Sequence, residues 1–310
     1  ATIIVTADDF SSNPVSASCE IGVKIVTPIT GMTFTEDTEL NQLGYGQEYQ
    51  IKYTLEPVDA TASLLTWASD NPEVISVDKT GKLKVHTTKT ASAVITASYG
   101  PVVQNVTVTV ADGRFWYSLG NGLGNGLDNN WYLDGNNASV VSSDGNKTTV
   151  QMGSGYRGDL WLARSGKGKI VNVTPADYRY FAIKVGFKSQ LVPGKNKPNG
   201  CIKLEIFDDG IKKIGPEYFG TGGDANNSYE ILGASEISTT EPNVLYYDLQ
   251  SKYKTVTPTD WNQVFDLVQC KFVIADFPET AQTYDLYWIR SFKSIEELQA
   301  FVDSENNTNE

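Results

Sequence analysis

The sequence predicts an all-β protein that consists of two β-sandwiches. Thr, Tyr, Val and Ile dominate its periodic segments, and these residue types favour strands over helices. Most segments of strand length alternate apolar and polar residues and are separated by turn residues, whereas helical periodicity is almost confined to the C-terminal end. With 310 residues, the chain is too long for one small core and has room for two or three domains.

Residues 27–111 show the pattern of a small antiparallel sandwich. Alternating segments recur about every ten residues, from GMTF through LLTWAS and KLKVH to NVTVTV. Turn residues separate these segments, for example the Asn-Pro pair at 71–72. Trp67 lies in the middle of a predicted strand, and we expect its ring to belong to the core.

The same stretch resembles the second group of bacterial Ig-like domains (Big2). The matching segments are, in chain order, PITGMTF, YGQEYQIKYTLEPVDAT, LTWASDNPEVISVDKTGKLKV, and VITASYG followed by NVTVTV. Together they cover the domain from end to end. The resemblance implies an Ig-like sandwich that serves as a spacer or adhesion module outside the cell, usually in tandem copies.

Residues 1–26 repeat the end of this domain. ATIIVTAD is similar to SAVITASY, and IGVKIVTP is similar to NVTVTV. We therefore expect these residues to be the last two strands of a preceding Ig-like unit whose front half is missing. Because an isolated two-stranded hairpin is at best marginally stable, the strands should pack on the neighbouring domain or on strands absent from this sequence.

Residues 112–303 contain no repeat and predict a larger jelly-roll sandwich. Roughly ten strand-like segments occur there, among them RYFAIKVGF, CIKLEIFD, CKFVIADF and TYDLYWIRSF. Ser294 and Glu297 form a capping box, which predicts a short helix near the C-terminus. Residues 304–310 are expected to be a disordered polar tail.

The closing segment YDLYWIRSFKSIEELQAF is similar to the last strand and helix of sandwich domains in surface proteins of gut Bacteroidetes. The WYLDG segment at Trp131 and the order of the domains support this resemblance. It implies a carbohydrate-binding-module-like domain in a polysaccharide-uptake system. It also implies an outer-membrane lipoprotein, with its lipidated Cys absent from this chain, that works beside an outer-membrane glycan transporter. We expect the protein to be a monomer.

Charge and composition argue against several classes of function. The net charge of -12 and the lack of a Lys/Arg stripe disfavour binding to nucleic acid. The three cysteines lie far apart, which disfavours a disulfide network or a structural zinc site. His86 is the single histidine, so a Ser-His-Asp triad would have to be built on a residue of the Ig-like domain.

A pair of carboxylates is the remaining route to catalysis. Glu205 with Asp208 and Asp209 is the best candidate, but Glu205 shares its strand face with Lys203 and the two aspartates belong to a turn. We therefore expect a protein that is not an enzyme and has no cofactor. Structural calcium would have to bind at acidic turns, namely Asp128–Asn130, Asp208–Asp209 or Asp224–Asn227.

Aromatic residues near loops of the second region predict a sugar-binding site. A neutral sugar presents flat C–H faces and a rim of hydroxyls, which exposed rings and neighbouring amide, carboxylate or Arg groups can bind. The candidate residues are Trp116, Trp131, Tyr132, Tyr156, Arg157, Asp159 and Trp161.

The tryptophans of this set differ in the alternatives that they leave open. Trp161 alternates with two leucines, so its ring either faces solvent or lies in a strand buried on both sides. Trp116 follows the inter-domain boundary, and we expect it to plug the junction together with Phe115. Trp131 follows the Gly/Asn-rich loop GNGLGNGLDNN and is the better candidate for a ligand.

The sequence thus predicts a non-catalytic, cell-surface protein that binds a polysaccharide or oligosaccharide. Two alternatives stay open. An adhesin or structural stalk that binds a host protein would show an exposed apolar patch or an open sheet edge. A glycoside hydrolase fragment would need two facing carboxylates in a cleft.

Overall fold

The structure, a computed structural model, consists mainly of β-strands and has one α-helix among the residues that it describes. This confirms the predicted all-β class. The described residues are 2–7, 15–20, 25–126, 130–134, 138–152, 157–163, 171–188, 201–208, 212–213, 230–250, 261–275 and 283–307.

The first unit is a small sandwich with a layered apolar core. Its strands and 3-10 turns are β3 (Gly31–Phe34), η1 (Thr38–Asn41), β4 (Leu43–Tyr45), β5 (Glu48–Gln50), β6 (Tyr53–Glu56), η2 (Ala62–Leu64), β7 (Thr66–Ser69), β8 (Ile75–Val77), β9 (Lys82–Val85), β10 (Ala91–Tyr99) and β11 (Val102–Ser118). β3 pairs with β6, β9 lies between β5 and β8, and β10 lies between β7 and β11. Trp67 is half-buried and stacks on Phe34 at 5.8 Å between ring centres, so it packs against the core as expected.

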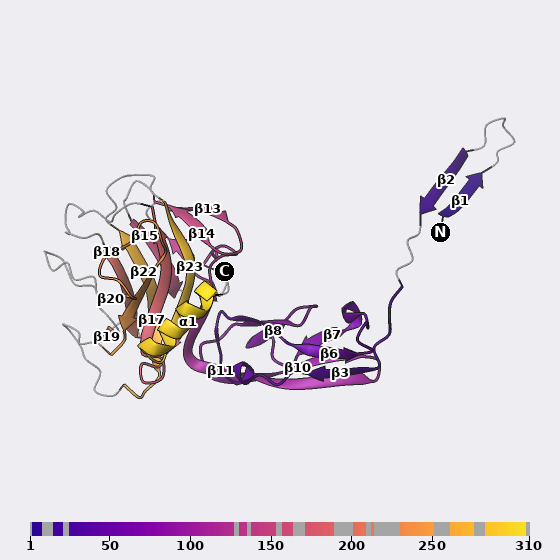
Figure 1. The fold of residues 1–310 in the computed structure, drawn as a ribbon, viewed down its shortest axis with the longest axis horizontal. Coiled ribbons are helices and arrows are strands. Elements are labelled where there is room, and N and C mark those ends of the chain that lie inside the picture. Colours follow the sequence, from indigo (N-terminus) through magenta and orange to yellow (C-terminus); the bar gives the residue numbers. More distant parts are fainter. Residues whose placement is uncertain are drawn as a thin grey trace.

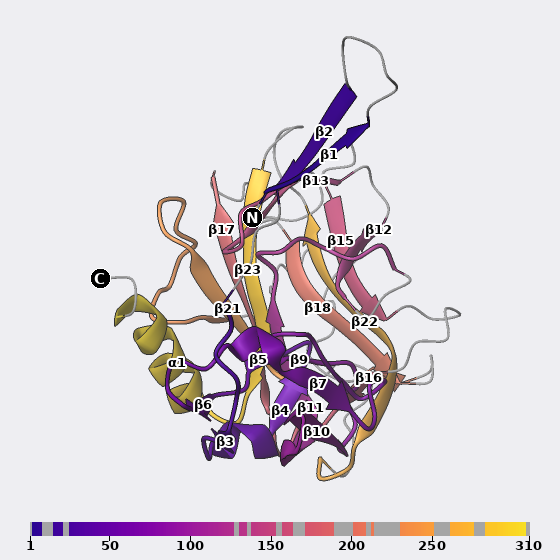
Figure 2. The same cartoon turned by 90° about the vertical axis from the view of Figure 1, so that its right-hand side faces the viewer.

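The second unit is a larger sandwich of two sheets. Its elements are β12 (Tyr132–Asp134), β13 (Ser139–Ser143), β14 (Thr148–Gln151), β15 (Arg157–Ala163), β16 (Val171–Val173), β17 (Tyr180–Phe187), β18 (Cys201–Asp208), β19 (Lys212–Lys213), β20 (Glu230–Ile231), β21 (Asn243–Asp248), β22 (Phe265–Ala275), β23 (Thr283–Phe292) and the helix α1 (Ile295–Asn307). One sheet has the order β20-β21-β17-β23, and β23 also pairs with β14 and β11; the other has the order β12-β15-β22-β18-β19. Figures 1 and 2 show the two sheets facing each other. Their inner faces meet at large apolar side chains such as Phe181, Leu204 and Phe272, which are fully buried because alternate residues of each strand point inward.

A single strand joins the two units. β11 pairs with β10 in the first unit and then, through Trp116 to Ser118, with β23 in the second. The expected boundary between residues 111 and 112 therefore falls inside one continuous strand, which Figure 1 shows bending from one unit into the other.

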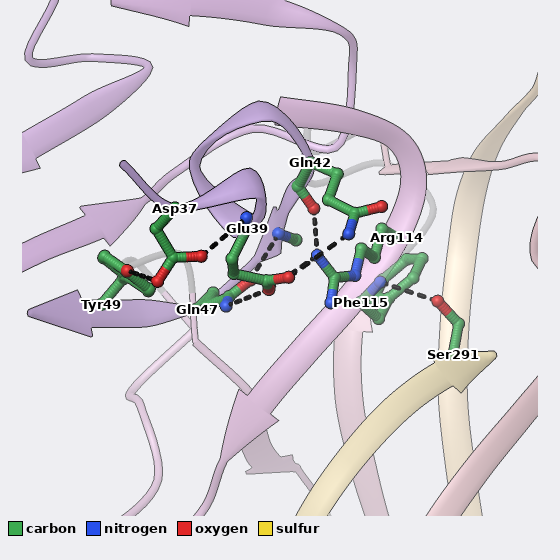
Figure 3. A network of polar contacts seen from close by, with 9 residues as sticks. Asp37, Glu39, Gln42, Gln47, Tyr49, Arg114, Phe115 and Ser291 are labelled. Carbon is green, nitrogen blue, oxygen red and sulfur yellow. Dashed lines mark hydrogen bonds and ion pairs between the residues drawn. The ribbon is translucent and has the colours of Figure 1, made fainter. Parts of the chain in front are cut away.

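The junction around this strand is closed by apolar and polar contacts. Tyr45 of the first unit belongs to the core of the second, where its ring meets Phe115 at 6.0 Å. Beside it, the buried Arg114 pairs with Glu39 at 2.9 Å and donates to the carbonyl of Gln42 (Figure 3). These contacts confirm that Phe115 plugs the junction.

Residues 1–26 contain two paired strands, as expected, but they are β1 (Thr2–Ala7) and β2 (Val15–Glu20), so the second strand precedes IGVKIVTP. Among the described residues neither strand pairs with another unit, and a preceding Ig-like unit stays a prediction.

The expectation about the C-terminal end was wrong. Residues 304–307 are not a disordered tail but the last turn of α1. Glu305 holds this turn on the sheet, since its carboxylate accepts from Trp288 Nε1 at 3.0 Å and from Lys184 Nζ at 3.1 Å. The predicted start of α1 is confirmed, because Ser294 Oγ accepts from the backbone N–H of Glu297.

Replacement of Gly113 by Ala should destabilise the junction. Gly113 has a φ of 66°, and a Cβ there would lie 2.4 Å from Thr174 Oγ1 and 2.5 Å from Thr174 N. We expect Gly113→Ala to lower the free energy of unfolding by about 2–4 kcal/mol, measured by urea denaturation. Gly100→Ala is the matched control: its φ is 56°, but no atom lies within 4 Å of the added Cβ. Its cost should be about 1 kcal/mol, and equal losses in the two variants would contradict the close approach at Gly113.

Candidate functional site

Trp131 does not face a ligand. Its side chain is 0% exposed and packs between the two sheets, with ring centres 5.6 Å from Phe272 and 6.2 Å from Tyr117. The Gly/Asn-rich loop returns to this point, where Gly124 N–H donates to the Trp131 carbonyl at 2.6 Å. The expectation for Trp131 was therefore wrong, because the loop delivers its ring into the sandwich rather than to its rim.

Trp161 and Asp159 occupy the outward face of β15 but are covered. They lie opposite the inward Leu160 and Leu162, yet Trp161 is only 8% exposed. The ammonium group of Lys271, on the neighbouring β22, lies 4.4 Å from the centre of the Trp161 ring and 3.1 Å from the Asp159 carboxylate. The strand is thus buried on both sides, and neither residue offers an open surface to a sugar in this structure.

Trp116 is half-buried, but its ring is crowded. The guanidinium carbons of Arg114 and Arg290 lie 4.6 and 4.4 Å from the ring centre. The rings of Phe292 and Phe301 approach it to 5.7 and 5.3 Å. These neighbours occupy the ring surface, so Trp116 helps to seal the junction and does not form a stacking platform.

The remaining predicted site residues are described only in part. Tyr132 is half-buried in β12, where its ring lies close to Gly126. Arg157 is part of β15, but its side chain lies outside the described residues, as does the whole of Tyr156. The acidic turns considered for calcium also lie largely outside the described residues. Among the residues that the structure describes, no three His, Cys, Asp or Glu side chains are grouped to hold a metal ion.

A groove that the sequence did not predict lies on the outer face of the second unit. It has a volume of about 720 Å³ and separates α1 from the β13–β14 turn. We call it the Tyr287 groove, and its polar and aromatic lining comprises Asn146, Lys184, Glu241, Tyr287, Glu305 and Asn306. The helix α1 crosses this face of the sheet (Figure 1) and forms one wall of the groove.

A β-bulge places both Tyr287 and Trp288 on the outer face of the sheet. Lys184 is paired with Trp288 and Val185 with Leu286, so Tyr287 is an extra residue in β23. A Cβ on Gly186 would lie 3.5 Å from Tyr287 Cε2 and 3.7 Å from its hydroxyl, which places the phenol against the backbone of β17. The ring is half-buried, and this burial raises the pKa of the Tyr287 hydroxyl. The hydroxyl stays protonated at neutral pH and can both donate and accept hydrogen bonds.

Asp285 fixes the turn on one side of the groove. Its side chain is 1% exposed and accepts from Lys147 Nζ at 2.8 Å and from Thr149 Oγ1 at 2.7 Å, while Lys188 pairs with it at 2.8 Å. Burial opposes ionisation of this carboxyl, but these partners more than offset it and lower its pKa. The clamp holds Asn146 beside Tyr287, because Asn146 directly precedes Lys147.

Lys184 and Glu305 shape the opposite side. Their ion pair at 3.1 Å joins β17 to α1, and Lys184 Nζ lies 5.6 Å from the Tyr287 ring centre. The groove therefore places one phenol ring among amides, carboxylates and an ammonium group, which together can bind a ring of hydroxyls. The adjacent aromatics Tyr287 and Trp288 break the alternation of β23, and this break is the signal that could have indicated the bulge.

A family model described as a domain of unknown function, DUF4979, matches residues 122–298, more than half of the chain. No curated protein matches the chain in sequence. Among solved structures, it is similar to the M60 catalytic domain with the CBM51-1 and CBM51-2 domains of Clostridium perfringens ZmpB, at 13% identity and a TM-score of 0.24 over 91% of this chain and 24% of that one.

Two further structures give similar values. Domains 1–6 of the surface layer protein SbsC match at 12% identity and a TM-score of 0.23, over 86% of this chain and 31% of that one. The CBM51-2 and INT domains of ZmpB match at 11% identity and a TM-score of 0.20, over 83% and 48%. The chain thus spans between a quarter and a half of the length of these structures, and such scores carry no argument about function.

Replacement of Asp285 by Asn should make the protein less stable at neutral pH but not at low pH. The folded-state pKa of Asp285 lies below the value of about 3.9 for an unfolded chain. Its stabilising contribution is therefore present above pH 4 and is lost as the pH falls through the folded-state pKa. We expect Asp285→Asn to lower the free energy of unfolding by about 2 kcal/mol at pH 7, with the difference shrinking below pH 4.

Urea denaturation between pH 2.5 and 7 measures this difference. Asp59→Asn, at an exposed position of the first unit, is the control and should stay within about 0.5 kcal/mol of the parent protein. A constant difference between Asp285→Asn and the parent at every pH would show that the clamp does not depend on the ionised carboxylate.

Proposed function

We propose that this chain, which belongs to the DUF4979 family, is a non-catalytic protein that binds polysaccharide at the cell surface. One observation carries the proposal: a partly exposed phenol ring, Tyr287, lies in an open polar groove on the outer face of the second unit. The bulge and Gly186 hold this ring along the sheet rather than in the core.

The lining of the groove suits a neutral sugar chain. The ring face of Tyr287 can stack on C–H groups of one sugar residue, as aromatic side chains do with flat apolar surfaces. Asn146 and Asn306 carry both donors and acceptors for hydroxyls, and Glu241 adds acceptors. A single shallow ring should give a Kd between about 1 μM and 1 mM, and many copies on one cell would raise the effective affinity.

The first unit fits the role of a spacer in this proposal. It has the layered sandwich that its resemblance to Big2 domains implies, and the shared strand β11 fixes it to the second unit. Such a unit would hold the groove away from the membrane at a constant angle. We extend the proposal to an outer-membrane lipoprotein that acts as a monomer beside a glycan transporter, on the resemblance to surface proteins of Bacteroidetes alone. Among the described residues, no helix has the length and apolar character needed to cross a bilayer.

An adhesin is the second candidate function, and β13 favours it. Among the described residues this strand pairs only with β14, and all its residues are exposed, including Val140 at 44% and Val141 at 55%. A partner strand could add to this open edge through backbone hydrogen bonds.

Loss of the Tyr287 ring should abolish binding to sugar. In affinity electrophoresis against plant, yeast and host polysaccharides, we expect at least one polymer to retard the parent protein without being shortened. Tyr287→Ala should lose that retardation, with at least tenfold weaker binding, because the stacking surface is removed.

Tyr246→Ala is the matched control, since Tyr246 is a partly buried tyrosine on the same sheet but outside the groove. It should migrate like the parent protein in the presence of polymer. Normal retardation of Tyr287→Ala would rule out the groove as the site. No retardation of the parent by any polymer would favour the adhesin.

A further inference from the structure

A second, smaller hollow lies where the two units meet. It has a volume of about 250 Å³, slightly below the usual range of about 300–1,000 Å³ for the pockets of drug-sized ligands. We call it the junction pocket. The first unit contributes Glu48 and Lys84, β11 contributes Trp116, the Gly/Asn-rich loop contributes Asn121 and Asn130, and β23 contributes Arg290.

Arg290 is a buried cation with incomplete hydrogen bonding. Its side chain is nine-tenths buried, and its Nε has no hydrogen-bond partner among the described residues. The carboxylate of Glu305 is 3.9 Å from Nη1, beyond hydrogen-bond range. Burial lowers the pKa of Arg290 to about 10, so the group remains charged at neutral pH.

Three aromatic rings surround this guanidinium but accept no conventional hydrogen bond from it. Its carbon lies 4.4 Å from the centre of the Trp116 ring, 5.3 Å from that of Trp288 and 4.2 Å from that of Phe301. Ring faces stabilise the positive charge, but they provide no oxygen acceptor for its N–H groups. The cage therefore holds the guanidinium in place, and because Nε is itself enclosed, a ligand in the pocket would meet the two terminal Nη groups.

The charges around the junction pocket are mainly positive. Lys84 is exposed at its rim, and Glu48, its one acidic lining residue, already pairs with Lys82. Arg114, the other cation that lies against the Trp116 ring, pairs with Glu39. This local excess of cations stands out in a chain with a net charge of -12.

We propose that the junction pocket binds the carboxylate of a single acidic sugar residue, a uronic acid. A carboxylate can receive two hydrogen bonds from a guanidinium, and desolvation of the pocket strengthens this pairing. The exposed Asn121 offers an amide donor and acceptor to sugar hydroxyls, and the size of the pocket suits one sugar residue. The inference adds a second site to the proposed function and stands on residues that the Tyr287 groove does not use.

Titration calorimetry of the full chain with small ligands tests this proposal. Glucuronate should bind with a Kd in the millimolar range or tighter. Glucose, which lacks the carboxylate, and acetate, which lacks the sugar ring, should each bind at least tenfold more weakly. Equal binding of acetate or inorganic sulfate would overturn the proposal, since the sugar ring would then contribute nothing. Absence of binding by glucuronate would overturn it as well.

Charge variants at the rim locate the site without disturbing the core. Asn121→Asp places a negative charge on an exposed lining residue, and it should weaken glucuronate binding about five- to tenfold. Asn125→Asp makes the same change on an exposed residue of the same loop outside the pocket, so it should bind like the parent protein. Equal effects of the two variants would contradict the assignment.

Two further variants separate this site from the groove. Arg290→Lys keeps the positive charge but cannot donate two parallel hydrogen bonds to a carboxylate, so it should bind glucuronate at least tenfold more weakly at an unchanged melting temperature. If this variant has a lower melting temperature, Lys84→Gln is measured instead, and we expect it to bind glucuronate about threefold more weakly. Tyr287→Ala should bind glucuronate normally while losing retardation by neutral polymer. Loss of glucuronate binding in Tyr287→Ala would overturn the junction pocket, whereas loss of retardation by neutral polymer in the same variant would leave the proposed function standing.

Discussion

The two units share one strand, and the other features of the molecule depend on this constraint. β11 completes a sheet in each unit, so a rotation of one unit against the other would break backbone hydrogen bonds that have no other partner. Gly113 lets the strand pass close to Thr174, and Tyr45 and Phe115 bring the two cores into contact. Domains joined by a flexible polar linker usually move relative to each other, and this arrangement opposes such motion.

The strand β23 builds both hollows, but it gives them different chemistry. In its first half, Tyr287 presents a phenol on the outer face, and Asp285 holds the neighbouring turn. In its second half, Arg290 enters a cage of rings and faces the junction. Glu305 of α1 lies between them and contacts Lys184, Trp288 and Arg290. The C-terminal helix therefore organises the outer face of the sheet.

The sequence predicted a sugar-binding site built from exposed aromatic rings, but the tryptophans that it favoured do not offer such rings. Trp131 and Trp161 have the right chemistry for sugar binding, but both are buried in the structure. Alternation along β15 correctly placed Trp161 opposite Leu160 and Leu162, yet alternation alone does not show whether the outward face is covered. Tyr287 was not among the predicted site residues, because a single inserted residue reverses the faces of a strand and periodicity averages over it.

The sequence by itself determined the all-β class, the strands of both sandwiches and the start of α1, because these depend on residue preferences and short-range patterns. Only the tertiary structure decided that the two units share β11, that α1 extends through Asn307, and that Tyr287 rather than Trp131 faces solvent. The reason is physical. Exposure and pairing are set by neighbours that are distant in the sequence, such as Asp285 with Lys147 or Arg290 with Phe301, and no local pattern contains those distances.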